Sequence, residues 1–104
     1  MGDRAMAEIK VKDGSLYFYT HSYGFKLYEM GKNALKKASG RIGDDAYALK
    51  IVVDSLINES ESRDCEIGAG LMLGPDAEDE YNNDNPSVII DLVKNRVVSK
   101  AVER

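Results

Sequence analysis

The sequence has little of the residues on which most protein chemistry depends. It contains one cysteine, one histidine and no tryptophan among its 104 residues. A single cysteine cannot form a disulfide within the chain, which favours a reducing compartment. One histidine and one cysteine also fall short of a zinc site, unless carboxylates or a second subunit complete the ligand set.

Long apolar runs are missing as well. No stretch of the sequence approaches the roughly 20 apolar residues that cross a bilayer, and the opening MGDRAMAEI has no hydrophobic signal core. We therefore predict a cytoplasmic protein without a membrane partner. Neither a P-loop nor a dinucleotide-binding glycine fingerprint is present, and we predict no cofactor.

The chain that remains has the composition of one folded domain. Hydrophobic residues make up 43% and charged residues 31% of it, which is typical of globular proteins of this length. We predict a single domain over residues 8–98. Residues 1–7 are expected to be a flexible N-terminus, and residues 99–104 a polar tail.

The first half of the chain predicts a hairpin followed by a helix. Residues 8–12, EIKVK, alternate apolar and polar side chains, and Asp13-Gly14 is typical of tight hairpin turns, so residues 15–21 should return as the second strand. Apolar residues then recur at helical spacing from Leu27 to Ala38. Gly31 lies on this apolar stripe, where a missing side chain allows another element to approach closely.

The second half predicts a second helix and further strands. Asp44-Asp45 suits the start of a helix, and the residues after it are apolar around more than half of the circumference, which predicts the more buried helix. Strands are expected over residues 65–73 and 87–93, with Val97-Val98 as a short final strand. The predicted order is β-β-α-α-β-β, and the predicted fold is α+β, an antiparallel sheet with two helices packed on one face.

Residues 15–21 also predict a surface for a partner. Tyr17, Tyr19 and His21 point to one face of the strand, and tyrosines suit a half-covered face or a subunit contact. Together with Tyr23, the two strand tyrosines form our predicted partner surface. If this face of the sheet is uncovered and also carries Ile89 and Val93, homodimerisation would cover it.

His21 is the best single candidate for catalysis, because an imidazole changes its charge near neutral pH. It lies at a strand end close to Tyr23, the other catalytic candidate. The adjacent Ser22 should point to the opposite face, which argues against a direct contact. Cys65 is a second candidate nucleophile, but its acidic neighbours disfavour the thiolate. The alternative is structural: a histidine bonded to the backbone, and a buried thiol.

Two charged segments are candidates for other kinds of binding. The loop over residues 74–86 offers oxygen ligands for calcium or magnesium, although it lacks the EF-hand pattern and is favoured to be solvated. The polar face of the first helix is basic and suits a nucleic-acid backbone, but the net charge of −4 argues against this partner. The candidate metal ligands are Asp76, Glu78, Asp79, Glu80 and Asp84, and the candidate nucleic-acid residues are Lys32, Lys36, Lys37 and Arg41.

Several short motifs follow one another along the chain in an order that resembles that of a known family. They are YTHSYG, KLYEMGKNALKKA, DDAYALKIVVDSLINE, IGAGLML and DNPSVIIDLV, within residues 16–98. In this order they resemble a family of small uncharacterised bacterial and phage-type proteins with the pattern YTHxxG, helix, DDxYxxxII, GxGI, acidic loop, IIVDL. Ile42-Gly43 departs from that pattern, where a tryptophan is expected. The resemblance implies the order of elements and no activity.

These observations give one leading hypothesis and two alternatives. We predict a non-catalytic interaction or regulatory module that forms a homodimer, with a further protein partner as an extension. The first alternative is a small hydrolase or transferase that uses His21 in a cleft. The second alternative is a nucleic-acid accessory protein that binds through the basic face of the first helix.

Overall fold

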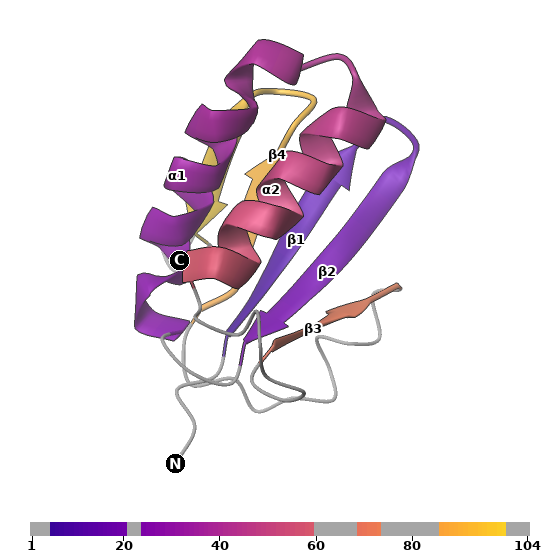
Figure 1. Ribbon diagram of the computed structural model, residues 1–104. Coiled ribbons are helices and arrows are strands. Elements are labelled where there is room, and N and C mark those ends of the chain that lie inside the picture. Colours follow the sequence, from indigo (N-terminus) through magenta and orange to yellow (C-terminus); the bar gives the residue numbers. More distant parts are fainter. Residues whose placement is uncertain (1–4, 21–23, 60–68, 74–85, 100–104) are drawn as a thin grey trace.

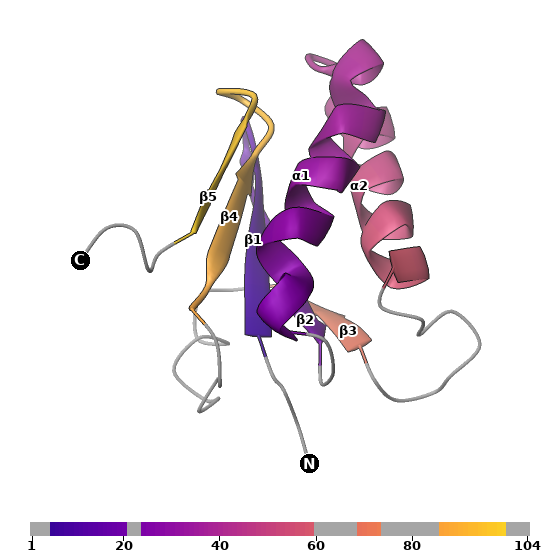
Figure 2. The same ribbon diagram turned by 90° about the vertical axis from the view of Figure 1, so that its left-hand side faces the viewer.

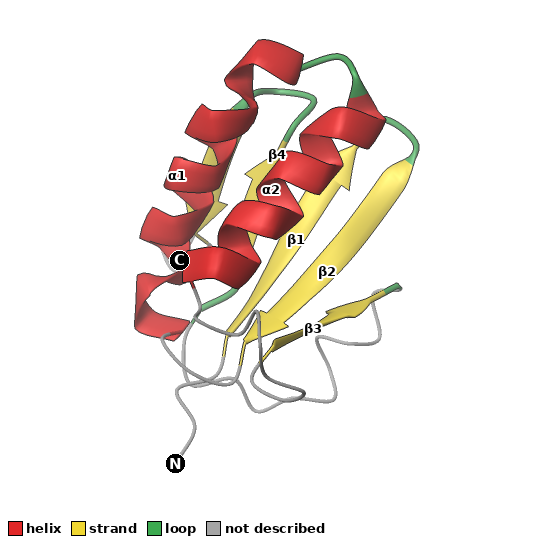
Figure 3. Cartoon of the chain, in the orientation of Figure 1, coloured by secondary structure: helices red, strands yellow, loops and turns green. Residues whose placement is uncertain are grey.

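The computed structural model describes residues 5–20, 24–59, 69–73 and 86–99. In these ranges, two helices cover one face of a five-stranded sheet (Figures 1 and 2). Figure 3 separates the helix layer from the strands behind it. The predicted α+β class, with both helices on one face, is confirmed. The strands are β1 Ala5–Val11, β2 Gly14–Thr20, β3 Ala69–Met72, β4 Val88–Asp91 and β5 Arg96–Ser99, and the helices are α1 Leu27–Ala38 and α2 Asp45–Glu59, with 3₁₀ turns η1 Gly24–Lys26 and η2 Ser39–Arg41 before them.

The strand order is β3-β2-β1-β4-β5. Three neighbouring pairs are antiparallel, but β1 and β4 are parallel, so the prediction of a wholly antiparallel sheet is wrong for this pair. The reason is that β4 does not lie beside β3, which precedes it in the chain. Residues 73–87 separate the two strands, a connection long enough for the chain to cross to the other side of β1.

The sheet begins earlier in the chain than predicted. Ala5, Met6 and Ala7 belong to β1 and are buried, so a flexible N-terminus over residues 1–7 is wrong for its last three residues. The ladder with β2 continues to the pair Ala5 and Thr20. Alanines at this end of the strand take little space, which suits a position beneath the helix layer. At the other terminus, β5 ends at Ser99, one residue beyond the predicted domain.

The main core lies between the sheet and the helices. The alternation predicted for β2 is confirmed, because Phe18 belongs to this core while Tyr17 belongs to a separate cluster with Met6. The core is apolar, and its buried members are Ala5, Ala7, Ile9, Phe18, Leu27, Met30, Ala34, Ala38, Ala48, Val52, Leu56, Val88, Ile90 and Leu92.

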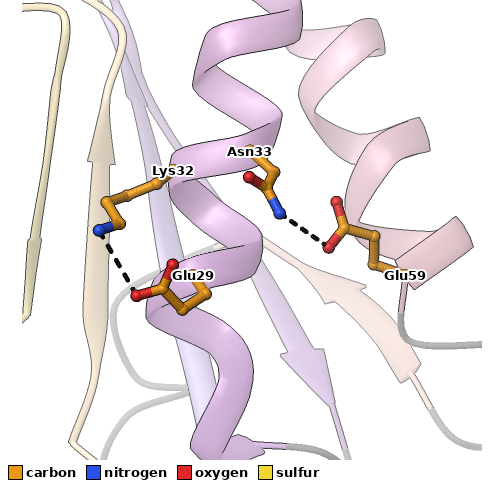
Figure 4. Close-up of polar contacts among 4 residues, drawn as sticks. All are labelled: Glu29, Lys32, Asn33 and Glu59. Atoms are coloured by element: carbon orange, nitrogen blue, oxygen red, sulfur yellow. Dashed lines mark hydrogen bonds and ion pairs between the residues drawn. The ribbon is translucent and has the colours of Figure 1, made fainter.

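The two helices are also joined by polar contacts through Glu59. The Asn33 amide of α1 donates a hydrogen bond of 3.3 Å to this carboxylate, as Figure 4 shows, and Ser55 of α2 donates one of 3.4 Å. α2, predicted to be the more buried helix, has four fully buried residues against five in α1, but five of its 15 residues are exposed against six of 12 in α1. More of the circumference of α2 is apolar than is buried, and Leu49, Val53 and Ile57 stay half-buried along one side.

Gly31 sets the distance between α1 and the strands beneath it. A Cβ atom at this position would lie 3.2 Å from Ile90 Cγ1 and 3.4 Å from Val97 Cγ1. The predicted close approach at Gly31 is confirmed, and its partners are β4 and β5. Any larger side chain here must push α1 away from the sheet or displace both neighbours.

Gly31→Val should therefore destabilise the fold. We expect the free energy of unfolding to fall by about 2 kcal/mol, because the added methyl groups overpack the contact with Ile90 and Val97. Chemical denaturation followed by circular dichroism measures this change. Gly40→Val is the matched control, since a Cβ at Gly40 meets nothing within 4 Å. An equal loss in both variants would contradict the close-packing argument.

Candidate interaction surfaces

Several residues singled out from the sequence lie outside the described residues. They include the catalytic candidates His21 and Tyr23, the thiol of Cys65, and the acidic candidates Asp76, Glu78, Asp79, Glu80 and Asp84. The enzyme hypothesis and the cation hypothesis therefore stay predictions. Within the ranges that the structure describes, no group of three or more His, Cys, Asp or Glu side chains could hold a metal ion. No described helix is long and apolar enough to cross a membrane.

The predicted tyrosine surface lies on the face of the sheet opposite the helices. Tyr17 is buried there and packs with Met6, while Tyr19 is half-buried against them. Ile89 shares this face, because both it and Tyr17 pair with Glu8. Val93 does not share it, since it lies in the turn after β4. The tyrosines therefore offer less exposed apolar area than their sequence pattern suggests.

Polar side chains occupy one end of the same face, beside the turns that follow β1 and β4. The Ser15 hydroxyl donates a hydrogen bond of 2.6 Å to Glu8 Oε2. Lys10 lies between Ser15 and Asp91 in the sheet register, and Arg96 pairs with Asp91 on the far side. Charges of both signs thus alternate across three neighbouring strands at this end, whereas the adjacent row of the face holds Tyr17, Glu8, Ile89 and Val98.

Asp91 has a structural role at the end of β4. It is buried, and its Oδ1 atom accepts hydrogen bonds from the backbone N–H of Val93 at 3.0 Å and of Lys94 at 2.9 Å. This carboxylate satisfies two backbone donors in the turn that leads to β5, in the manner of an Asx turn. In the same turn, Asn95 adopts a left-handed conformation, with φ of 57°.

Asp91→Ala should loosen the hairpin of β4 and β5. Two backbone N–H groups are left without their acceptor, and we expect the free energy of unfolding to fall by about 1–3 kcal/mol. Asp91→Asn keeps an oxygen at the same position and should be less destabilised. Thermal unfolding of the two variants beside the wild type measures the difference, and equal melting temperatures for all three proteins would contradict this role.

The most exposed apolar side chains of the sheet lie at β3. Leu71 and Leu73 are 48% and 79% exposed, although their alternation in the sequence suggests a core-facing strand. In register, Leu71 pairs with Phe18 and so belongs to the helix side of the sheet. The helices do not extend over this edge, and β3 lies beyond the strands that α2 covers (Figure 1). The alternation in the sequence predicts the face on which Leu71 lies, but it does not predict how far the helices extend across the sheet.

The two edges of the sheet differ in their protection. β5 begins at Arg96 and follows Lys94, and charges of this kind discourage another strand from pairing with an edge. β3 has the sequence AGLM, with no charge and no proline. Among the described strands it has one neighbour, β2. Over the four residues that the structure describes, the β3 edge therefore carries no charge and no proline against the pairing of a further strand.

The predicted nucleic-acid residues lie on exposed positions of α1 and η2. Lys32, Lys36 and Lys37 of α1 and Arg41 of η2 are exposed, as predicted. Two of them have partners on the surface. Lys32 Nζ lies 3.4 Å from Glu29 Oε2 (Figure 4) and 4.9 Å from the Tyr28 ring centroid, and the Arg41 guanidinium lies 5.0 Å from the Tyr47 ring centroid.

Comparison with known proteins adds no further constraint. No family model, curated protein or solved structure matches the chain. The resemblance to the small bacterial and phage-type family stays a prediction from its motifs.

Proposed function

We propose that this protein is an interaction module that forms a homodimer by pairing the β3 edges of two copies. The observation that carries the proposal is an edge strand without charge or proline among its described residues, together with two exposed leucines, Leu71 in β3 and Leu73 directly after it. Exposed edges with large apolar side chains recruit another strand unless charges, prolines or bulges prevent it. A binding mode of this kind uses backbone hydrogen bonds for affinity and side chains for specificity.

A second copy of the same chain is the partner that this edge suits best. Two identical strands can pair antiparallel about a twofold axis, so that each copy presents the same surface to the other. Because the four described residues of β3 carry no charge, the symmetric pairing of these residues brings no like charges together. The exposed leucines of both copies would lie on the helix side of the joined sheet, where Leu71 already lies.

Pairing of the two β3 strands alone does not bury enough area for a stable dimer. A strand pair of four residues, as in β3, is too short to bury the roughly 1,200–2,000 Å² of a stable interface. The half-buried side of α2 carries Leu49, Val53 and Ile57 and supplies additional apolar area. We place it in the same interface, so that α2 of each copy packs on the leucines of its partner.

This proposal relocates the dimer that the sequence suggests. The tyrosine surface was the expected interface, but Tyr17 is buried, Tyr19 is half-buried, and charged residues occupy one end of that face. Burial of Leu71 and Leu73 favours association more than burial of the tyrosine surface does, because burying a leucine side chain contributes about 1.5–3 kcal/mol. The partner surface we favour is therefore the β3 edge.

Sedimentation velocity over a range of concentrations tests the proposal. The chain has a mass of 11.5 kDa, and the wild type should sediment as a dimer of twice that mass. Leu73→Lys places a charge at the edge and should yield a monomer, because a buried unpaired ammonium opposes strand pairing. Circular dichroism should show an unchanged fold, since Leu73 is exposed.

Two further variants locate the interface. Val93→Lys is the matched control, because Val93 is 56% exposed and lies in the turn between β4 and β5. It should remain a dimer. Val98→Lys tests the helix-free face, which Val98 shares with Ile89. A monomeric wild type, or a dimer that is abolished in Val98→Lys and kept in Leu73→Lys, would overturn the proposal.

A further inference from the structure

The two helices carry opposite charge. Over residues 24–43, α1 and its flanking turns hold five Lys or Arg residues and one acid, a balance of +4. Over residues 44–59, one lysine stands against four acids, a balance of −3. The described residues as a whole hold ten basic and eight acidic side chains, so the negative net charge of the chain comes from residues outside them. The net charge is thus a poor guide to what α1 attracts.

Exposed aromatic rings accompany the basic side chains of this region. Phe25 is 65% exposed, Tyr28 is 36% exposed and Tyr47 is 54% exposed. A cation lies near each ring: Lys26 at 5.7 Å from the Phe25 centroid, Lys32 at 4.9 Å from that of Tyr28, and Arg41 at 5.0 Å from that of Tyr47. Lysines on a solvated helix face are ordinary, but three exposed rings beside them are not required by the fold. We call Tyr28, Lys32 and Lys36 of α1 the basic aromatic flank; the other two pairs lie beyond its ends in the chain, in η1 and between η2 and α2.

We propose that the basic aromatic flank binds single-stranded nucleic acid. Lysine and arginine side chains contact phosphates, and exposed rings stack on unpaired bases. A duplex hides its base faces and would leave the Tyr28 ring unused. An acidic peptide would satisfy the cations alone. Only an unpaired strand uses both kinds of side chain, and this is why we favour it as the partner.

The positions of these residues on α1 define the direction in which a bound nucleic-acid strand would run. Tyr28, Lys32 and Lys36 follow one another at intervals of four residues, which places them in one line along the helix. α1 has 12 residues and is therefore about 18 Å long. In Figure 4, Lys32 extends from the side of α1 opposite Asn33, which faces α2. The acidic side chains of α2 repel phosphates, so the nucleic-acid strand is directed along the side of α1 that is remote from α2.

Fluorescence anisotropy with labelled oligothymidylate of about 20 nucleotides tests this proposal on the full chain. The wild type should bind at about 50 mM salt, and its affinity should fall as salt rises. Lys32→Ala/Lys36→Ala should bind about tenfold more weakly, and its salt slope should be smaller by about 0.7 for each phosphate that the variant no longer neutralises. Lys12→Ala/Lys50→Ala is the matched control: it removes the same charge from exposed positions elsewhere and should bind like the wild type.

The tyrosine variants separate stacking from charge. Tyr28→Leu should weaken binding by about 5- to 100-fold with an unchanged salt slope, because the variant removes a stacking ring and leaves every phosphate-binding cation in place. Tyr28→Phe keeps the ring and should bind like the wild type. Absent binding at low salt, a Tyr28→Leu variant that binds normally, or equal competition by duplex DNA or polyglutamate would overturn the proposal. The dimerisation of these variants should be unaffected, since α1 lies apart from β3.

Discussion

The contact between Gly31 and the pair Ile90 and Val97 determines how the rest of the molecule is arranged. Because no side chain separates them, α1 lies close against β4 and β5. α2 packs beside α1 and lies over β1 (Figure 1). Two helices placed in this way cover one part of the sheet and leave β3 uncovered. A close contact on one side of the molecule thereby leaves an exposed apolar edge on the other.

The two faces of the helix layer then serve different purposes. The inner faces of both helices build the apolar core, and the outer faces differ in charge, basic on α1 and acidic on α2. The edge at β3 and the basic aromatic flank of α1 are consequently separate surfaces of different chemistry. One offers backbone groups and leucines, and the other offers cations and an aromatic ring. A dimer formed at the edge would leave both copies of the flank accessible.

Much of this architecture could be predicted from local patterns. The apolar stripe of α1, the hairpin at Asp13-Gly14 and the alternation around Phe18 all follow from short-range spacing, and the structure agrees with them. The position of β4 could not be predicted in this way, because the placement of a strand after a long connection depends on the whole sheet.

The candidate surfaces were harder to predict than the fold. Alternation assigns Leu71 to a face of its strand, but whether a helix covers that face depends on tertiary packing. Tyr17 likewise points to the expected face, yet it is buried. The basic side of α1 was predictable from helical spacing, whereas the pairing of Arg41 with Tyr47 joins two elements and required the fold.

Intermolecular nuclear Overhauser effects test whether two copies of the chain meet at β3 and α2. In a sample that mixes isotope-labelled and unlabelled chains, only contacts between two copies give filtered signals. The account predicts signals from the methyl groups of Leu71 and Leu73 of one copy to α2 of the other. Signals confined to Ile89 and Val98, or none at concentrations in the millimolar range, would contradict it.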